Sequence, residues 1–290
     1  MTIQAWKAAG QTFTYKGHRI FYRSEGKGPD LIILHGFPTA SWDWWKMWPQ
    51  LTQQFTVHAP DFLGFGYSDK PKSYAYSMVD QASLLEALAN HLNVQQAHLL
   101  CHDYGNSVGQ ELLARALSKE SGALGFKILS CCFLNGGLFP ESHHPRLIQK
   151  VLASPVGPYL HAFITKQSLE RNFKAIFGPQ TPPTDQEIDE FWALIMEQQG
   201  KRVIPKLLGY LRERREQRSR WVGALEQTKV PLGMINGPED PISGRHLAEA
   251  FRACRPDAYY QLLEGIGHYP QTEAPEAVSE AFSEFHRSLG

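Results

Sequence analysis

The chain has 290 residues, a length that suits one α/β domain carrying an inserted segment. Hydrophobic residues make up 42% of it and charged residues 20%, which is typical of a globular protein with a substantial core. Lys plus Arg and Asp plus Glu both number 29, so the net charge is zero, which argues against nucleic acid as a partner.

The N-terminus and the cysteines both favour a cytoplasmic protein. The opening residues MTIQAWKAAGQTFTYKG contain no apolar run behind a basic segment, so we expect no signal peptide. No apolar stretch approaches the roughly 20 residues that cross a bilayer, and we expect no membrane partner. Cys101, Cys131, Cys132 and Cys254 fit neither a disulfide framework nor a paired metal-binding motif, so we expect reduced thiols.

The first half of the chain alternates strand patterns with a helical pattern. The predicted strands are Thr12–Tyr15, His18–Arg23, Leu31–Leu34, Thr56–Ala59 and Ala97–Leu100. The last three are continuous apolar runs, as in strands buried on both faces of a parallel sheet. Ser77–His91 carries apolar residues at helical spacing.

The second half contains a long interruption. After a strand pattern at Lys127–Leu134, residues 138–221 show helical patterns, many prolines and aromatics, and no convincing buried strand. The rhythm then resumes with a strand, a helix, a strand and a helix: Leu232–Asn236, His246–Ala253, Tyr259–Leu263 and a final helix after Pro275. We therefore predict a mostly parallel eight-stranded sheet with flanking helices, formed by residues 1–137 and 222–290. Residues 138–221 are expected to form a helical cap over the carboxyl edge of the sheet, where such sheets bind ligands.

The densest charge run of the chain lies inside the expected cap. Arg212 to Arg220 reads RERREQRSR, and Glu213 and Glu216 interrupt the cations. Mixed charge at helical spacing predicts a solvated helix face with local ion pairs.

The most informative segment for function is AHLLCHDYGNSVGQELL. A buried strand ends at Leu100 and a helix begins near Tyr104, so the turn falls on Asp103. A nucleophile elbow needs small residues two positions either side of the nucleophile, and Cys101 and Gly105 meet that need. The Tyr104 backbone N–H, at the helix N-terminus, could stabilise an oxyanion.

Ser107 offers an alternative nucleophile. Gly105-Asn106-Ser107-Val108-Gly109 satisfies the G-x-S-x-G pattern of serine hydrolases. Placing the turn there would bury His102 and Asp103 in the strand, which is costly for an ionised group. We therefore favour Asp103 and expect Ser107 to lie one turn inside the helix.

Three further segments complete a catalytic constellation. His35-Gly36-Phe37-Pro38 follows a strand, and the Phe37 backbone N–H is the candidate second oxyanion donor. His268 follows Gly265-Ile266-Gly267 after the last strand. Asp240 in Gly237-Pro238-Glu239-Asp240-Pro241 is the expected acid partner of this histidine, with Glu239 as the reserve. The chain order is nucleophile, acid, histidine.

Two other motifs favour structural interpretations. His143-His144 has no third ligand at recognisable spacing, so we expect no metal site there. Asp61 to Ser68 (DFLGFGYS) lacks the Lys and Ser/Thr of a phosphate loop and is expected to form a tight loop near the active-site mouth.

Nearly the whole chain resembles the α/β-hydrolase superfamily. HGFPTASWDWW, DFLGFGYSDKP, HDYG and GHYPQTEAPE are similar to the branch containing epoxide hydrolases and haloalkane dehalogenases. LNGGLFPE and RWVGAL are similar to the mesoderm-specific transcript proteins of animals and their bacterial relatives. The resemblance implies an α/β-hydrolase fold and an Asp103–His268–Asp240 triad that forms an alkyl ester on Asp103 without metal or cofactor.

The family patterns also bear on the small-molecule substrate. Haloalkane dehalogenases carry Asn and Trp as halide donors where this chain has Phe37 and Tyr104, whereas epoxide hydrolases share HGFP. Epoxide hydrolases use cap tyrosines to protonate the epoxide oxygen, and Tyr159 and Tyr210 are the candidates here. The aromatic residues expected to contact substrate are Trp42, Tyr159, Tyr210 and Trp221.

Four functional hypotheses follow. The first is an Asp-nucleophile hydrolase most similar to epoxide hydrolases, and the second is a dehalogenase using the same nucleophile. The third is a serine-type esterase using Ser107. The fourth is a non-catalytic binding protein that keeps the fold.

Overall fold

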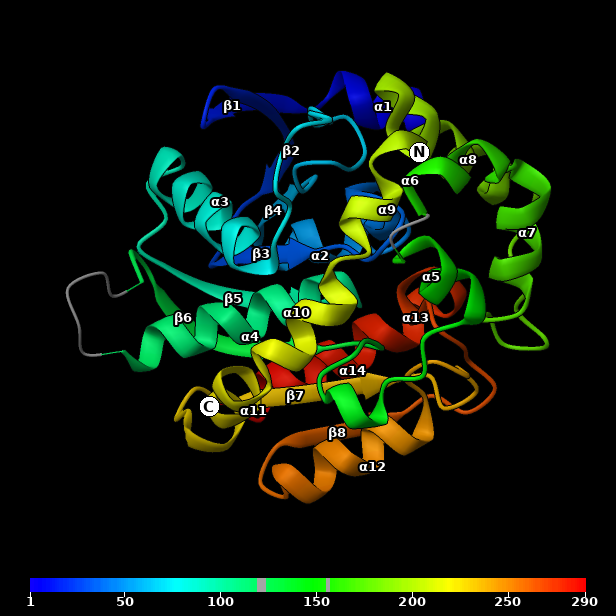
Figure 1. The fold of residues 1–290 in the computed structure, drawn as a ribbon. Coiled ribbons are helices and arrows are strands. Elements are labelled where there is room, and N and C mark those ends of the chain that lie inside the picture. Colours follow the sequence, from blue (N-terminus) through cyan, green and yellow to red (C-terminus); the bar gives the residue numbers. More distant parts are fainter. Residues whose placement is uncertain (119–123, 155–156) are drawn as a thin grey trace.

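A central eight-stranded sheet organises the computed structural model, which describes residues 1–118, 124–154 and 157–290 (Figure 1). The strands are β1 (Gln11–Tyr15), β2 (His18–Gly26), β3 (Asp30–Leu34), β4 (Thr56–Pro60), β5 (Gln96–Cys101), β6 (Lys127–Phe133), β7 (Leu232–Asn236) and β8 (Tyr259–Leu262). Their order is β1-β2-β4-β3-β5-β6-β7-β8, and only the β1–β2 and β2–β4 pairs are antiparallel. The predicted mostly parallel sheet of eight strands is confirmed.

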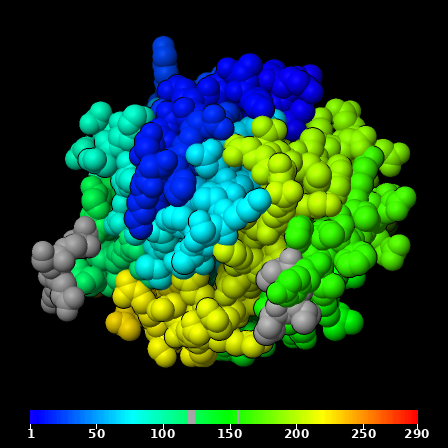
Figure 2. All heavy atoms as spheres, turned by 45° about the horizontal axis from the view of Figure 1, so that its top comes forward, coloured from blue at the N-terminus to red at the C-terminus, as the bar shows by residue number. Residues whose placement is uncertain are grey.

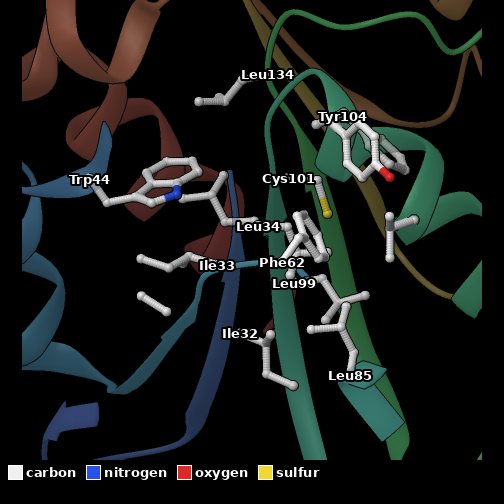
Figure 3. Packing of buried hydrophobic residues seen from close by; sticks show 14 of the residues in the cluster. Ile32, Ile33, Leu34, Trp44, Phe62, Leu85, Leu99, Cys101, Tyr104 and Leu134 are labelled. Atoms are coloured by element: carbon white, nitrogen blue, oxygen red, sulfur yellow. The ribbon is translucent and has the colours of Figure 1, made fainter. Parts of the chain in front are cut away.

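The apolar runs of the sequence form the interior of this sheet. Ile32, Ile33 and Leu34 of β3 are at most 1% exposed, and β5 beside them contributes the equally buried Leu99 and Cys101 (Figure 3). Strands covered on both faces require apolar side chains at successive positions, which is why these runs do not alternate.

Helices cover both faces of the sheet. α4 contacts both α3 and α11, and these three helices lie in front of the sheet in Figure 1, while α2 and α14 lie behind it. The helices outside the insertion are α1 (Ile3–Ala8), η1 (Ser41–Trp44), α2 (Trp48–Gln54), α3 (Met78–His91), α4 (Tyr104–Leu117), α11 (Arg218–Gln227), α12 (Arg245–Cys254), α13 (Pro270–Glu273) and α14 (Pro275–Arg287). The Ser77 hydroxyl caps α3 by accepting the Asp80 N–H at 3.0 Å, so the predicted helix begins one residue later.

Between β6 and α11 the described chain contains helices and no strand. These are η2 (Pro140–Ser142), α5 (Leu147–Leu152), α6 (Gly157–Leu160), η3 (His161–Phe163), α7 (Lys166–Lys174), α8 (Asp185–Met196), η4 (Glu197–Arg202), α9 (Ile204–Leu207) and α10 (Tyr210–Glu216). α5 to α9 gather at one end of the sheet (Figure 1). The expected boundary at residues 221 and 222 falls inside α11, which packs on α4.

The insertion and the N-terminal segment form one continuous surface. Yellow-green atoms of the insertion adjoin the blue N-terminal atoms in Figure 2, and the Lys7 Nζ lies 3.2 Å from the Glu197 Oε1. No helix in the described parts of the chain is long and apolar enough to cross a membrane.

Candidate active site

Asp103 occupies a sharp turn between β5 and α4. Its backbone has φ +43° and ψ −98°, a conformation that costs a non-glycine residue about 1–3 kcal/mol. Close packing maintains the turn: a Cβ on Gly105 would lie 2.6 Å from the Leu34 Cβ, and one on Gly136 would lie 2.6 Å from the Asp103 Cα. The sequence thus places a carboxylate where strand, turn and helix meet.

The Asp103 carboxylate accepts a backbone N–H, and a second backbone N–H follows it in the chain. Its Oδ2 accepts the Phe37 N–H at 3.0 Å. Tyr104 is the first residue of α4, and an N–H in this position has no acceptor within the helix. The Tyr269 hydroxyl donates to the Phe37 carbonyl at 3.1 Å and so holds the loop that carries the first donor.

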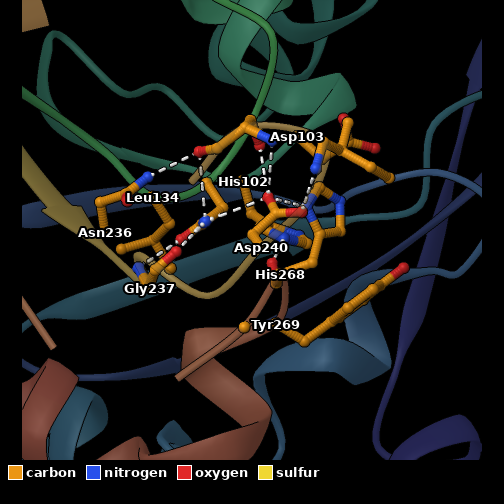
Figure 4. A network of polar contacts seen from close by, with 12 residues as sticks. His102, Asp103, Leu134, Asn236, Gly237, Asp240, His268 and Tyr269 are labelled. Carbon is orange, nitrogen blue, oxygen red and sulfur yellow. Dashed lines mark hydrogen bonds and ion pairs between the residues drawn. The ribbon is translucent and has the colours of Figure 1, made fainter. Parts of the chain in front are cut away.

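His268 and Asp240 form the second part of the site (Figure 4). The His268 Nδ1 lies 2.6 Å from the Asp240 Oδ2, and both side chains are buried. The Ser243 hydroxyl and N–H donate to the same Oδ2, and the Ile242 N–H donates to the Oδ1. The Asn135 Nδ2 also donates to the Oδ2, at 3.1 Å. With His268, the Asp240 carboxylate therefore has five hydrogen-bond partners, which hold it in the position that orients the imidazole.

The three titratable groups perturb one another. Burial lowers the pKa of His268, but the charges of Asp240 and Asp103 outweigh it and raise this pKa to about 9. Burial raises the pKa of Asp103, but the charges of His268 and Arg214 outweigh it, so its pKa lies below the ordinary value. The pKa of Asp240 falls to about 2, since the His268 charge and several hydrogen bonds overcome the effect of burial.

Arg214 is a cation in this site that the sequence prediction missed. Its side chain is 2% exposed, its Nη2 donates to the Asp103 carbonyl at 2.9 Å, and the same nitrogen lies 3.5 Å from the Asp103 Oδ1. The expectation that residues 212–220 form a solvated face is wrong at this position, because α10 turns Arg214 inward while Arg212 and Arg215 remain exposed. The three arginines differ in burial only because α10 packs its Arg214 side against the turn that carries Asp103.

Ser107 lies inside α4 and is fully buried. Its Oγ accepts the Arg214 Nε at 2.8 Å. It is not among the residues that line the cavity described next.

A cavity of about 330 Å³ lies between the insertion and the sheet. Asp103, His268 and Phe37 line one end of it. Its remaining walls are predominantly apolar side chains of the insertion, among them Leu152, Leu169, Phe173, Ile195 and Leu208. The arrangement presents a carboxylate and an imidazole to a mostly apolar cavity, the kind of space that holds an apolar small molecule.

The four aromatic residues expected at the substrate site lie in different places. Tyr210 is buried beside the site, with its ring 5.8 Å from that of Phe37. It does not line the cavity itself, but its hydroxyl accepts a hydrogen bond at 3.3 Å from the Gln149 Nε2, and Gln149 does line the cavity. Tyr159 is 81% exposed. Trp42 and Trp221 are buried and donate to Glu190 and Glu111, respectively, and neither lines the cavity.

Other polar residues near the site carry supporting contacts. The His102 Nε2 lies 2.8 Å from the His268 carbonyl, and burial lowers the pKa of His102 to about 4. His143 lines the cavity, with its Nε2 3.4 Å from the Arg214 Nη1. Glu239 makes a backbone contact with Ile266, and no described contact joins its side chain to His268. The sequence indicated a place near the site for His102, because this residue directly precedes Asp103 at the end of a predicted strand, whereas the contact of His143 with Arg214 could not be predicted.

Comparisons with known proteins agree with the fold. Residues 29–275 match the family described as alpha/beta hydrolase fold. The chain is 43% identical to the mesoderm-specific transcript protein of Mus musculus, over 99% of this chain and 88% of that protein. It is 38% identical to the putative hydrolase LipZ of Mycobacterium tuberculosis, over 97% and 96% of the two chains.

Solved structures with low sequence identity share the architecture. The haloalkane dehalogenase DatA from Agrobacterium tumefaciens superposes with a TM-score of 0.80 at 17% identity, covering 97% of each chain. The epoxide hydrolase CorEH superposes with a TM-score of 0.74 at 21% identity, covering 97% of this chain and 99% of its own.

Proposed function

Because the chain belongs to the alpha/beta hydrolase fold family, we propose that it is a hydrolase that uses Asp103 as a nucleophile, with an epoxide on a small apolar molecule as its substrate. His268 and Asp240 complete the triad, and the N–H groups of Phe37 and Tyr104 form the oxyanion hole. The helices of residues 138–217 act as the cap that encloses the substrate.

One observation carries the proposal: a carboxylate, not a hydroxyl, occupies the strained turn beside the cavity. Asp103 has φ +43° and lines the cavity together with His268. Ser107, the competing nucleophile, is fully buried in α4 and accepts a hydrogen bond from Arg214. A serine nucleophile needs access to substrate and a neighbouring base, and Ser107 has a cation instead.

In the first step, an Asp103 oxygen attacks an epoxide carbon. The C–O bond of the ring breaks, an ester bond forms, and the alkoxide takes a proton from a nearby acid. Tyr210 is the best-supported acid: burial and the Asp103 charge raise its pKa, so it stays protonated, and the Arg214 guanidinium lies 4.4 Å from its ring centre. That cation would stabilise the phenolate left behind.

In the second step, water cleaves the ester. Esterification removes the Asp103 charge that helps to raise the pKa of His268, so the imidazole releases its proton to solvent more readily and becomes a base. His268 then takes a proton from water, whose oxygen attacks the Asp103 Cγ. The Phe37 and Tyr104 N–H groups stabilise the oxyanion. When this intermediate collapses, the bond from Cγ to the alkyl oxygen breaks, and the proton of the added hydroxyl passes to the departing alkoxide, which leaves as the second hydroxyl of the diol. One oxygen of water stays in the Asp103 carboxylate, His268 keeps the proton that it took from water, and the Tyr210 phenolate regains a proton from solvent, equal to the one that His268 had released.

The residues around Asp103 favour an epoxide over a haloalkane. Halide release requires side-chain donors near the nucleophile, and Phe37 and Tyr104 occupy the two positions where dehalogenases carry them. Alkoxide release requires a proton donor, which Tyr210 can supply.

The test is to trap the ester. His268→Gln protein, incubated with terminal epoxides and with haloalkanes, should gain the mass of one epoxide on the peptide containing Asp103. The wild type, turned over in ¹⁸O-water, should incorporate the label into the Asp103 carboxylate, since water attacks that carbon.

Two results would contradict the proposal. Labelling of Ser107 by a fluorophosphonate would identify a serine enzyme. A haloalkane adduct with no epoxide adduct would retain the nucleophile and overturn the substrate class.

A further inference from the structure

Large exposed apolar side chains concentrate around the mouth of the cavity. Eight such side chains are exposed in the described chain, and five of them lie in α5, α6 and η3. We call these five the rim patch: Leu147, Ile148, Val151, Tyr159 and Phe163. Leu147, Tyr159 and Phe163 are 77%, 81% and 75% exposed, so they contribute little to the folded core. A cluster of this kind marks an interaction surface.

The rim patch is continuous with the cavity. Leu147 and Val151 lie one turn apart on α5, so they share a face of this helix. α5 contacts α6, and α6 contacts η3, which brings the three short helices together on the outer surface of the insertion (Figure 2, green). Ile148 and Phe163 are exposed and also line the cavity. A molecule covering the rim patch would therefore cover the cavity mouth.

The charge around the rim patch is positive. Residues 142–169 contain no Asp or Glu, but they contain Arg146, Lys150 and Lys166. Lys166 pairs with Asp189, whereas Arg146 and Lys150 form no ion pair with any residue that the structure describes. Apolar side chains next to two unpaired cations of α5, one of which (Arg146) also lines the cavity, match a bilayer surface with anionic headgroups.

We propose that the rim patch docks on an anionic lipid surface, in place of the expectation from the sequence that the protein has no membrane partner. A second copy of the chain fits less well, because a two-fold contact through this patch would bring Arg146 and Lys150 of both copies together. Docking would place the apolar cavity mouth against the bilayer. An apolar substrate could then enter from lipid, a corollary that rests on the proposed function.

Vesicle co-sedimentation tests this proposal. Wild-type protein should sediment with vesicles of phosphatidylcholine and phosphatidylglycerol, less with phosphatidylcholine alone, and less at high salt. Leu147→Ser/Tyr159→Ser should weaken the partition at least about tenfold, because neither exposed side chain lines the cavity and both lose apolar contact with lipid. Lys150→Glu should weaken binding to the anionic vesicles only.

The matched control is Leu117→Ser/Met196→Ser, which removes two exposed apolar side chains outside the rim patch. It should bind vesicles as the wild type does. Asp103→Asn protein should also bind normally, so that an error in the catalytic assignment cannot be confused with an error in docking.

Two outcomes would overturn the inference. One is equal sedimentation of the wild type and Leu147→Ser/Tyr159→Ser with anionic vesicles, including no sedimentation of either. The other is a dimer in sedimentation velocity that only the rim-patch variant abolishes, which would assign the surface to a second copy of the chain.

Discussion

Asp103 and Ser107 lie one helical turn apart, and their substitution should separate catalysis from stability. Asp103→Asn should lower kcat by at least ~10³-fold, because no ester can form without the carboxylate. Ser107→Ala should keep most activity but lower the free energy of unfolding by about 1–3 kcal/mol, since the buried Arg214 Nε loses its acceptor. Steady-state kinetics and urea unfolding measure the two effects. Inactivity of Ser107→Ala with normal stability would reverse the assignment.

The His268–Asp240 pair should make stability depend on pH. The folded-state pKa of His268 is about 9, above its ordinary value of 6.5. A raised pKa stabilises the protein fully below pH 6.5, and this contribution disappears as the pH rises through about 9. His268→Gln should therefore cost about 3 kcal/mol more at pH 6 than above pH 9, as measured by urea unfolding.

His144→Gln is the control for this measurement, because His144 is exposed and lies outside the network. It should change stability equally at both pH values. A His268→Gln penalty that does not vary with pH would contradict the assigned ion pair.

Arg214 should keep Asp103 ionised. Its charge lowers the pKa of Asp103, so Arg214→Met should move the acid limb of the kcat/KM profile to higher pH. Arg214→Lys retains the charge and should restore most of the wild-type profile. The neighbouring Arg215→Met removes an equal charge from the exposed face of α10 and should leave the limb in place. Identical profiles for both Met variants would show that the Arg214 charge has no such role.

Several residues of the candidate site could be predicted because each follows a strand of a parallel sheet. Asp103, Asp240 and His268 come after β5, β7 and β8, whose carboxyl ends share one edge. Arg214 could not be predicted, since its sequence neighbours are exposed cations and only tertiary packing turns it inward. The catalytic roles of Asp103, Asp240 and His268 remain predictions.

The packing of α4 against β3 makes Gly105 indispensable. A Cβ there would lie 2.6 Å from the Leu34 Cβ and 2.7 Å from the Leu34 carbonyl oxygen. Gly105→Ala should therefore lower the free energy of unfolding by about 1–3 kcal/mol and displace the turn that carries Asp103. Chemical unfolding and kcat/KM measure these effects.

Gly223→Ala provides the matched control in α11, the helix that packs on α4. A Cβ there would meet only the flexible Gln227 side chain, at 3.3 Å. Alanine is the better helix former, so this change should raise the free energy of unfolding by up to ~1 kcal/mol. Equal effects of the two substitutions would contradict the close approach described for Gly105.

The regular elements could be predicted better than the insertion. All eight strands lie within three residues of their predicted bounds. For central parallel strands such as β3 and β5 the reason is that burial on both faces requires a continuous apolar run. The insertion was predicted as helical, but its short pieces, such as the four-residue α6 and α9, depend on packing against one another and on the sheet edge. Sequence periodicity gives little information on segments this short.

Core and insertion together enclose an apolar cavity, so activity should depend on the apolar length of the substrate. In a series of terminal epoxides, kcat/KM should rise about fourfold per methylene, from ~0.8 kcal/mol each, until the 330 Å³ cavity is filled. Leu208→Phe, which narrows the cavity, should bring the plateau to a shorter chain. A flat series would show that substrate does not occupy this space.

Arg214 also fastens the insertion to the core. Swinging the insertion away as a rigid lid would strip this buried cation of its Asp103 and Ser107 partners, at a cost of about 3–5 kcal/mol. At equilibrium, the insertion would then be displaced from the core in only one molecule in roughly 10²–10⁴. Substrate and product should therefore enter and leave the cavity beside Ile148 and Phe163, which line it and are exposed. Turnover should depend on small local movements of α5 and η3 rather than on a hinge motion of the whole insertion.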